Sequence, residues 1–186
     1  MQLQLRVVTI SLRSGIHLGE REGWLEGTGP LPLADTLFSA FCNGYRLLYD
    51  EPELTQFLPM FIPGSTPFRI SSAFPEWEGF RYFPVPLNQI PAHKELKKIR
   101  WIEQSGFERL LMGEKLEDIV GSSPYICLPR KSITETDTDN APSMPWVIQE
   151  VPRVGLDRTN NHPGDRYFHF GQAWFRPAAS FFFLVD

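Results

Sequence analysis

The C-terminal part of the chain mixes cationic side chains with aromatic ones. Its arginines and candidate histidines are Arg153, Arg158, Arg166, His162 and His169. A cluster of Asn, Pro, Gly and Asp at positions 160–165 separates two extended arms, which predicts a long hairpin. Guanidinium groups can contact phosphates and rings can stack on bases, so this hairpin suits a single-stranded nucleic acid.

The same hairpin also has a simpler interpretation. Its arginines can pair with Asp157 and Asp165 on a solvated arm. Such charged hairpins are common, and exposed ion pairs contribute little. Composition by itself therefore favours the ion-paired hairpin, and a nucleic-acid site needs support from the rest of the chain.

The histidines define an alternative, catalytic chemistry. Metal-independent RNA cleavage needs a general base near the 2′-hydroxyl and an acid at the leaving oxygen, usually a His with a Tyr or Lys. The candidates are His17, His162 and His169, and each of them also fits as a loop or surface residue, as does His93. An RNA endonuclease is therefore the alternative function.

No pattern predicts a metal ion or a cofactor. Cys42 and Cys127 match no metal-ligand spacing, and we expect two reduced, buried thiols. The acidic residues within 131–145 lack the glycine and final glutamate of a calcium loop. The glycines between positions 15 and 29 are not followed by the Lys-Ser/Thr pair of a phosphate-binding loop.

Composition limits the kind of site that is possible. The 186 residues are 42% hydrophobic and 13% aromatic, so we expect one domain over 1–186 with a ring-rich core. The net charge of −4 argues against binding by bulk positive charge, and an RNA site has to be a local patch. No apolar run reaches membrane-spanning length and no secretory signal is present, which predicts a soluble cytoplasmic protein.

The start of the chain predicts a strand and a helix. Apolar residues alternate from Leu3 to Leu12, and a phase slip at Val7–Val8 indicates a β-bulge or a strand buried on both faces. Asp35 is placed to cap a helix that ends before Pro52. The apolar stripe of this helix consists of Leu37, Phe38, Phe41, Tyr45 and Leu48.

Short extended segments follow in a proline-rich region. Residues 68–74 and 80–83 predict a hairpin around a turn at 75–79, and 97–102 predicts an edge strand. The capping-box pattern of Ser105 and Glu108 then begins a short helix, and a C-cap glycine ends it at Gly113. A flexible loop is expected at about 131–145, a thumb hairpin at about 151–176 and a last strand at 181–185.

The order of these elements is strand, helix, hairpin, helix, long hairpin and strand. Without its insertions this is the β-α-β-β-α-β order of an α+β, ferredoxin-like domain, which RNA-recognition domains also use. The aromatic motifs with which ordinary RNA-recognition domains stack bases on their sheet are absent. A fold of this class does not by itself give a function.

Several stretches in order along the chain resemble the RAMP proteins of CRISPR systems, and most of all subunit four of the type III-A Csm complex, which caps the five-prime handle of the guide RNA. These stretches are 17–20 (HLGE), 33–40 (LADTLFSA), 70–75 (ISSAFP), 82–86 (YFPVP), 97–102 (KKIRWI), 107–113 (FERLLMG) and 154–159 (VGLDRT). Each is weak by itself, but their joint order over nearly the whole chain is specific.

The resemblance implies a non-catalytic subunit that binds the guide RNA (crRNA) and contacts the large polymerase-like subunit and a neighbouring backbone RAMP subunit. The long hairpin would be the thumb that lies against the RNA. Carried over by position, the RNA contacts would be Arg153, Arg158, Thr159, His162 and Arg166, with His17 and Ser39 as further candidates.

The chain also departs from the resemblance. Family members are usually longer, with a second ferredoxin-like half, so we expect an N-terminal half whose partner half is missing or is a separate chain. An exposed surface is then expected where that half would dock. A purely structural subunit that binds only protein is a further alternative, which Trp24 and Trp77 would fit as interface residues.

Overall fold

The structure is a computed structural model of the chain. It describes residues 5–19, 27–62, 66–89, 93–94, 96–121, 127–129, 144–156, 159 and 163–186, and it gives only the backbone at 121, 127–129 and 163–166. The chain divides into two compact units. Unit 1 comprises Met1–Ile10, Leu31–Ala73 and Phe181–Asp186, and unit 2 comprises Ser11–Pro30 and Phe74–Ser180.

Unit 1 is built on an antiparallel ladder. Strand β8 (Ala179–Val185), which begins in unit 2, pairs with β1 (Arg6–Ile10) through its unit 1 residues. On the other edge of β8, the Ser71 amide donates to the Leu184 carbonyl at 2.9 Å, and the Leu184 amide donates to the Ser71 hydroxyl at 2.9 Å. The apolar run at the end of the chain is therefore the centre of this ladder.

The predicted irregularity of the first strand is wrong. The register of β1 on β8 is continuous, so there is no bulge at Val7–Val8. Both valines are exposed, so the strand is not buried on both faces either.

The first helix, α1, spans Ala34–Tyr49 and ends as predicted before Pro52. Its predicted cap is wrong, because Asp35 lies inside the first turn and its carboxylate accepts from the adjacent Thr36 amide at 2.8 Å. The hydroxyl of Ser72 instead accepts from the Ala34 amide at 3.1 Å. The free amide of the helix start is therefore satisfied from a segment far along the chain.

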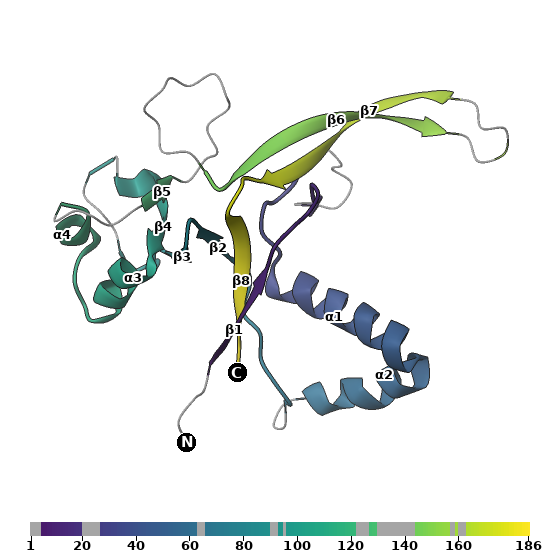
Figure 1. Ribbon diagram of the computed structural model, residues 1–186, viewed down its shortest axis with the longest axis horizontal. Helices are drawn as coiled ribbons and strands as arrows, with labels where there is room; N and C mark the ends of the chain where they lie inside the picture. The colour runs from purple at the N-terminus through teal and green to yellow at the C-terminus, as the bar shows by residue number, and fades with distance from the viewer. Residues whose placement is uncertain are drawn as a thin grey trace. The chain divides into compact units, whose positions relative to one another are not determined.

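Two short helical segments continue from α1 and complete a ring-rich surface. They are α2 (Glu51–Phe57) and the 3-10 helix η1 (Leu58–Phe61), and Figure 1 shows α1 and α2 joined at a sharp corner. Asp50 makes this corner with a φ of 79° and caps α2 by accepting from the Glu53 amide at 3.2 Å. Proline at position 52 fits the first turn of α2, where no backbone amide is needed.

A set of mutually contacting rings, the aromatic face, covers these helices. It consists of Phe38, Phe41, Tyr45, Tyr49, Phe57, Phe61 and Phe68. None of the residues of α1, α2 or η1 is fully buried. Leu48, predicted on the apolar stripe, is 77% exposed, and Cys42, expected to be buried, is half-buried. An exposed apolar surface is present as expected, and its occupant stays a prediction.

Unit 2 begins with four short antiparallel strands. They are β2 (Phe74–Trp77), β3 (Phe80–Pro84), β4 (Ile99–Glu103) and β5 (Cys127–Pro129), paired in this order. The turn of the β2–β3 hairpin is only Glu78–Gly79, both with positive φ, so the predicted turn at 75–79 and strand at 68–74 are shifted. The predicted edge strand β4 pairs on both of its sides and is not an edge.

Two helices pack their apolar sides on this sheet. The short 3-10 helix η2 (Leu96–Lys98) precedes β4, and α3 (Gln104–Leu111) and α4 (Leu116–Gly121) follow it. A core cluster of Ile102, Leu110, Leu116 and Ile119 joins these elements. The sheet and its helices therefore share one small core.

The ends of α3 confirm one prediction and correct another. Gly113 has a φ of 95° and its amide donates to the Leu110 carbonyl at 3.1 Å, as a C-terminal glycine should. The N-cap is Glu103 and not Ser105, whose hydroxyl donates to the Glu103 carboxylate at 2.9 Å. The capping-box pattern failed because β4 runs directly into the helix and fixes its start two residues early.

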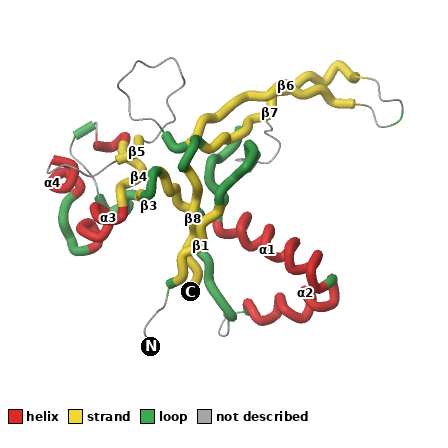
Figure 2. The backbone as a smooth tube through the Cα atoms, in the orientation of Figure 1, coloured by secondary structure: helices red, strands yellow, loops and turns green. Residues whose placement is uncertain are grey.

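The longest feature of unit 2 is the hairpin of β6 (Trp146–Leu156) and β7 (Pro163–Phe175), which Figure 2 shows as a long pair of yellow strands. It is antiparallel over its whole length, with a register shift between Val154 and Leu156. The predicted hairpin is confirmed, but it begins at Trp146 rather than near position 151. Of the loop expected at 131–145, only Met144 and Pro145 lie among the described residues, and both are buried.

The strand, helix, hairpin, helix, long hairpin and strand that were predicted occur in that order, but further elements lie between them, among them α2, β4 and β5. The chain is thus a mixed helix and strand protein with antiparallel sheets. The single domain and the ferredoxin-like topology stay predictions. Within the described ranges, no helix has the length and apolar character needed to cross a membrane.

Candidate nucleic-acid interface

The register of the hairpin sorts its side chains onto two faces. Successive residues of a strand point to opposite sides, and paired residues share a side. Val151 pairs with Phe170 and Arg153 with Phe168, so these four lie on one face, called here the Arg153 face. The opposite face carries Pro152 and Val154, paired with His169 and Tyr167 respectively.

A third extended segment lies along β7 and brings His17 to the Arg153 face. The Ile16 amide donates to the Ala173 carbonyl at 3.0 Å, and the Ala173 amide donates to the Ile16 carbonyl at 2.8 Å. His17 Nδ1–H donates to the Gly171 carbonyl at 2.7 Å. The imidazole stands 4.0 Å from the ring of Phe170, centroid to centroid. The histidine is therefore fixed by both a hydrogen bond and a ring contact.

A glycine makes this close approach possible. A Cβ atom added at Gly15 would lie 2.5 Å from Cε2 of Trp174, far inside van der Waals contact. Only a residue without a side chain leaves room for the indole at this point. Gly15 thereby allows the 15–17 segment to lie against β7, which places His17 beside Phe170.

Phe170 lies between two nitrogen-bearing groups. The guanidinium carbon of Arg153 is 6.0 Å from the Phe170 ring centroid, and the imidazole of His17 contacts the same ring. These three residues are called here the Phe170 cluster. Arg153 is exposed and, among the described residues, it makes no ion pair. Its charge therefore remains accessible to an anion, while the ring contact orients it.

The opposite face carries a different pair of rings. Tyr167 is 64% exposed, and its ring stands 5.5 Å from that of His169 at an angle of 85°. Val154 beside them is 44% exposed. The alternation within RYFHF at 166–170 already separates Tyr167 and His169 from Phe168 and Phe170, so this division was available from the sequence.

The structure brings together only part of the predicted RNA-contacting set. Arg153 and His17 meet at Phe170, and Thr159 is an exposed turn residue. Ser39 lies on α1 in unit 1, where its carbonyl accepts from the Asn43 amide at 2.9 Å. Arg158 and His162 lie outside the described residues, and Arg166 is placed in β7 by its backbone only.

Phe170 was missed as a candidate in the sequence. Its signal was its place two residues beyond Phe168 in a strand opposite an arginine, and that pairing becomes visible only with the register. The predicted ion pairs of the hairpin arginines are not described either, because Asp157 lies outside the described residues and Asp165 has only its backbone described.

Of the three histidines considered for catalysis, His162 lies outside the described residues, and the other two are separated. His17 contacts Phe170 on the Arg153 face, whereas His169 lies with Tyr167 on the opposite face. His93 is an exposed loop residue. A general acid and a general base have to reach the same phosphodiester, so His17 and His169 do not form such a pair in this arrangement.

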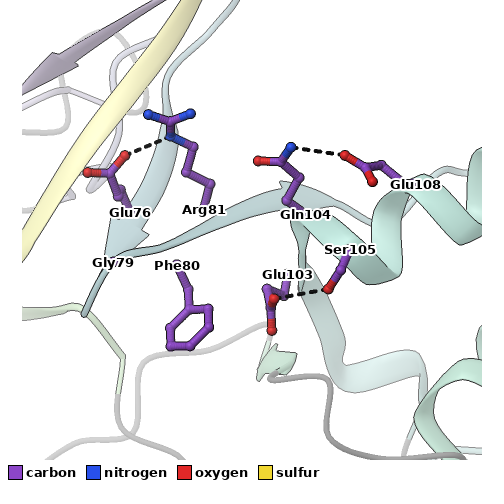
Figure 3. A pocket seen from close by; sticks show the side chains of 8 residues that line it. All are labelled: Glu76, Gly79, Phe80, Arg81, Glu103, Gln104, Ser105 and Glu108. Carbon is purple, nitrogen blue, oxygen red and sulfur yellow. Dashed lines mark hydrogen bonds and ion pairs between the residues drawn. The ribbon is translucent and has the colours of Figure 1, made fainter.

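A concave site elsewhere in unit 2 has the opposite charge. A cavity of about 370 Å³ opens between the β2–β3 turn and the start of α3 (Figure 3). Glu76, Glu103 and Glu108 line it with one cation, Arg81, whose Nε donates to Glu76 at 2.9 Å. This surplus of carboxylates repels phosphate, so the cavity does not compete with the hairpin as an RNA site.

The described residues contain no group of three or more His, Cys, Asp or Glu side chains that could hold a metal ion. One carboxyl has a perturbed pKa: the hydrogen bond from Arg109 holds the pKa of Glu114 below its usual value. This pair lies beside α3 and not at the hairpin.

Comparison with known proteins places this geometry in context. No family model matches the chain. A curated relative, the CRISPR system Cms protein Csm4 of Thermococcus onnurineus (strain NA1), is 27% identical over 157 residues, which cover 84% of this chain and 50% of the relative.

Solved structures agree at the level of the fold. A chain of the Csm1–Csm4 cassette in complex with AMPPNP has a TM-score of 0.56 at 22% identity, over 98% of this chain and 59% of that one. The resemblance to a Csm subunit four is thereby confirmed. A chain of the Csm3–Csm4 subcomplex of the type III-A interference complex has a TM-score of 0.57 at 15% identity, over 99% of this chain and 58% of that one. The chain thus has a Csm4-like fold and spans about half the length of its Csm4 relative.

Proposed function

We propose that this chain is a non-catalytic subunit of a type III CRISPR effector complex that holds the five-prime repeat handle of the guide RNA with the β6–β7 hairpin. The observation that carries the proposal is the Phe170 cluster, where an exposed arginine, which makes no ion pair among the described residues, and a histidine converge on one ring. The similarity to Csm4 is the reason for proposing a type III CRISPR effector complex as the assembly.

The distribution of charge on the hairpin supports the proposal. Glu150 pairs with Gly171 and so lies on the face opposite Arg153. The described side chains of β6 and β7 on the Arg153 face include no acid. A chain with a net charge of −4 therefore presents a local cationic and aromatic surface, as RNA recognition by a few contacts requires.

The geometry suggests how each group acts. The Arg153 guanidinium would donate to a phosphate oxygen, and its contact with the ring reduces the conformational freedom lost on binding. The Phe170 ring and the His17 imidazole would offer an apolar surface to a base or a ribose. The turn with Thr159, and with Arg158, His162 and Arg166 around it, would extend the same surface toward the tip.

The same proposal covers fold and partners. We infer that the chain is one ferredoxin-like half of a RAMP protein, with a second half supplied by another polypeptide or by a longer product. The Csm4-like structures contain Csm1 or Csm3. We therefore propose the large polymerase-like subunit and a neighbouring backbone RAMP subunit as the partners of this chain.

Binding of an oligoribonucleotide that carries the repeat handle tests the hairpin directly. We expect Arg153→Ala to weaken the affinity about tenfold and to lower the salt slope by about one, because one phosphate contact is lost. The matched control is Arg46→Ala on α1, an exposed arginine in unit 1 with the same loss of charge. Equal affinities and equal salt slopes for the two variants would overturn the assignment of the hairpin.

The alternative function is a metal-independent endoribonuclease. The separation of His17 and His169 onto opposite faces argues against it. Incubation with repeat RNA distinguishes the two functions, since a discrete cut that disappears in His169→Gln would favour the endonuclease.

A further inference from the structure

A second cavity in unit 2 has the features of a protein-binding site. It has a volume of about 650 Å³ and lies among the end of β3 and the segment after it, η2, β4 and the start of α4. Its lining is aliphatic, with Pro84, Val85, Leu96, Ile99 and Leu116. At its edge, Leu87 is 99% exposed, which is unusual for a leucine beside a cavity.

The floor of this cavity is part of the core. Leu116 is 2% exposed and belongs to the core cluster, and Val85 packs against the same cluster. The Val85 amide donates to the Arg100 carbonyl at 3.0 Å, which extends the β3–β4 pairing by one residue. The cavity is therefore formed by the folded sheet and does not depend on a ligand to shape it.

Hydrogen bonds also hold the opposite wall. The Gln89 side-chain carbonyl accepts from the Leu116 backbone amide at 3.1 Å, and the Gln89 side-chain NH2 group donates to the Glu114 backbone carbonyl at 3.4 Å. Arg109 in turn holds the Glu114 carboxylate, with Nε donating at 2.9 Å. The turn that presents Leu116 to the cavity is thus fixed from two sides.

The charged groups among the described lining residues are both cationic. They are Lys97 and Arg100, and both residues are exposed. The Arg100 guanidinium stands 5.6 Å from the Trp101 ring centroid, which orients it. Among the described residues neither cation makes an ion pair, and no Asp or Glu lines the cavity. An aliphatic cavity with two exposed cations, neither of which makes an ion pair among the described residues, favours a ligand that combines an apolar group with negative charge.

We propose that this cavity binds an acidic–aliphatic peptide segment of a partner protein, with a Leu-like side chain in the cavity and flanking carboxylates on Lys97 and Arg100. Among the described residues of the lining there is no aromatic side chain on which a base could stack. Leu87 would close over the inserted side chain, and its own exposed surface would be buried on binding. The site is separate in its residues from the Phe170 cluster and does not rest on RNA binding by the hairpin.

Fluorescence anisotropy with labelled peptides tests the proposal on the full chain. The probe is a nine-residue peptide with a central Leu flanked by two Glu on each side. Two comparison peptides replace the Leu by Ser or the four Glu by Lys. We expect binding of the first peptide that weakens with salt, and at least tenfold weaker binding of the other two.

Variants locate the binding. Lys97→Glu is expected to weaken the acidic peptide about tenfold, because it places a like charge beside the flanking carboxylates. Leu87→Ser, a change at a fully exposed side chain, is expected to weaken it about threefold. Lys94→Glu is the matched control, since Lys94 is exposed and outside the lining.

The outcomes separate cleanly. Equal binding of the three peptides, or equal loss in Lys97→Glu and Lys94→Glu, would overturn the site. The affinity of the Lys97→Glu variant for the handle RNA is measured last. An unchanged RNA affinity supports a peptide site, whereas a selective loss of RNA affinity would indicate a nucleic-acid site in its place.

Discussion

Rings gather in several regions of this molecule, and two of these regions, the aromatic face of unit 1 and the β6–β7 hairpin of unit 2, differ in what surrounds the rings. On the aromatic face the rings contact one another, as Tyr45 and Phe57 do at 4.8 Å and 13°. On the hairpin, Phe170 contacts an imidazole and a guanidinium. The aromatic residues of this chain therefore pack on one another in one region and contact nitrogen-bearing side chains in the other.

The energetic consequences differ accordingly. Ring pairs contribute about 0.5–1.5 kcal/mol each beyond the burial of area, so the aromatic face holds α1, α2 and η1 together. In the Phe170 cluster, Arg153 makes no ion pair among the described residues, so its charge remains available to a ligand. The first region is expected to control stability and the second to control binding, and three substitutions test this division.

The largest effect is expected at Phe41, whose ring contacts those of Phe38, Tyr45, Phe57 and Phe68. Phe41→Ala should lower the free energy of unfolding by about 2–3 kcal/mol, which is less than for a fully buried Phe because the side chain is partly exposed. Urea unfolding measures this change. Under conditions where the variant is folded, handle-RNA affinity should not change. A parallel loss of affinity would contradict the assignment of stability to the aromatic face and of binding to the Phe170 cluster.

A second substitution disrupts the packing of the 15–17 segment on the hairpin. Gly15→Val places side-chain atoms where the Trp174 ring lies, so it should displace the 15–17 segment from β7 and cost about 1–3 kcal/mol of stability. Handle-RNA affinity should fall with it, because His17 leaves Phe170.

Two further variants serve as a compensating change and as a control for Gly15→Val. Trp174→Ala in the Gly15→Val background should restore part of the affinity by making room for the new side chain. Gly44→Ala on α1 is the control, because a Cβ there meets nothing within 4 Å and should stabilise the helix by about 1 kcal/mol. If Gly15→Val binds RNA as well as the wild type does, the delivery of His17 by this segment is irrelevant to binding.

The smallest effect is expected from Phe170→Leu. The change keeps the apolar volume but removes the ring that Arg153 and His17 contact, so handle-RNA affinity should fall about threefold to tenfold with little change in stability. Equilibrium binding and urea unfolding on the same preparation measure both quantities. A large loss of stability with unchanged affinity would place Phe170 in the same class as Phe41.

Local signals predicted much of the secondary structure. The break before Pro52 and the C-terminal glycine at Gly113 each act within a few residues of the helix end that they mark, and the structure agrees at both. Of the turn cluster predicted at 160–165, positions 160–162 lie outside the described residues and 163–165 belong to β7. Both predicted N-caps failed. Asp35 and Ser105 each stand near a helix start, but β4 and Ser72 fix where the backbone turns.

The sequence by itself determined the order of the elements, the long hairpin with its cations and rings, and the resemblance to a Csm subunit four, because these depend on neighbours in the chain and on residue identity. Tertiary structure decided which residues meet. Ser72 reaches the start of α1, and His17 reaches Gly171 and Phe170, across 38 and 154 positions of sequence respectively. Such pairings depend on strand register and on the space left by Gly15, and no local pattern encodes either of them.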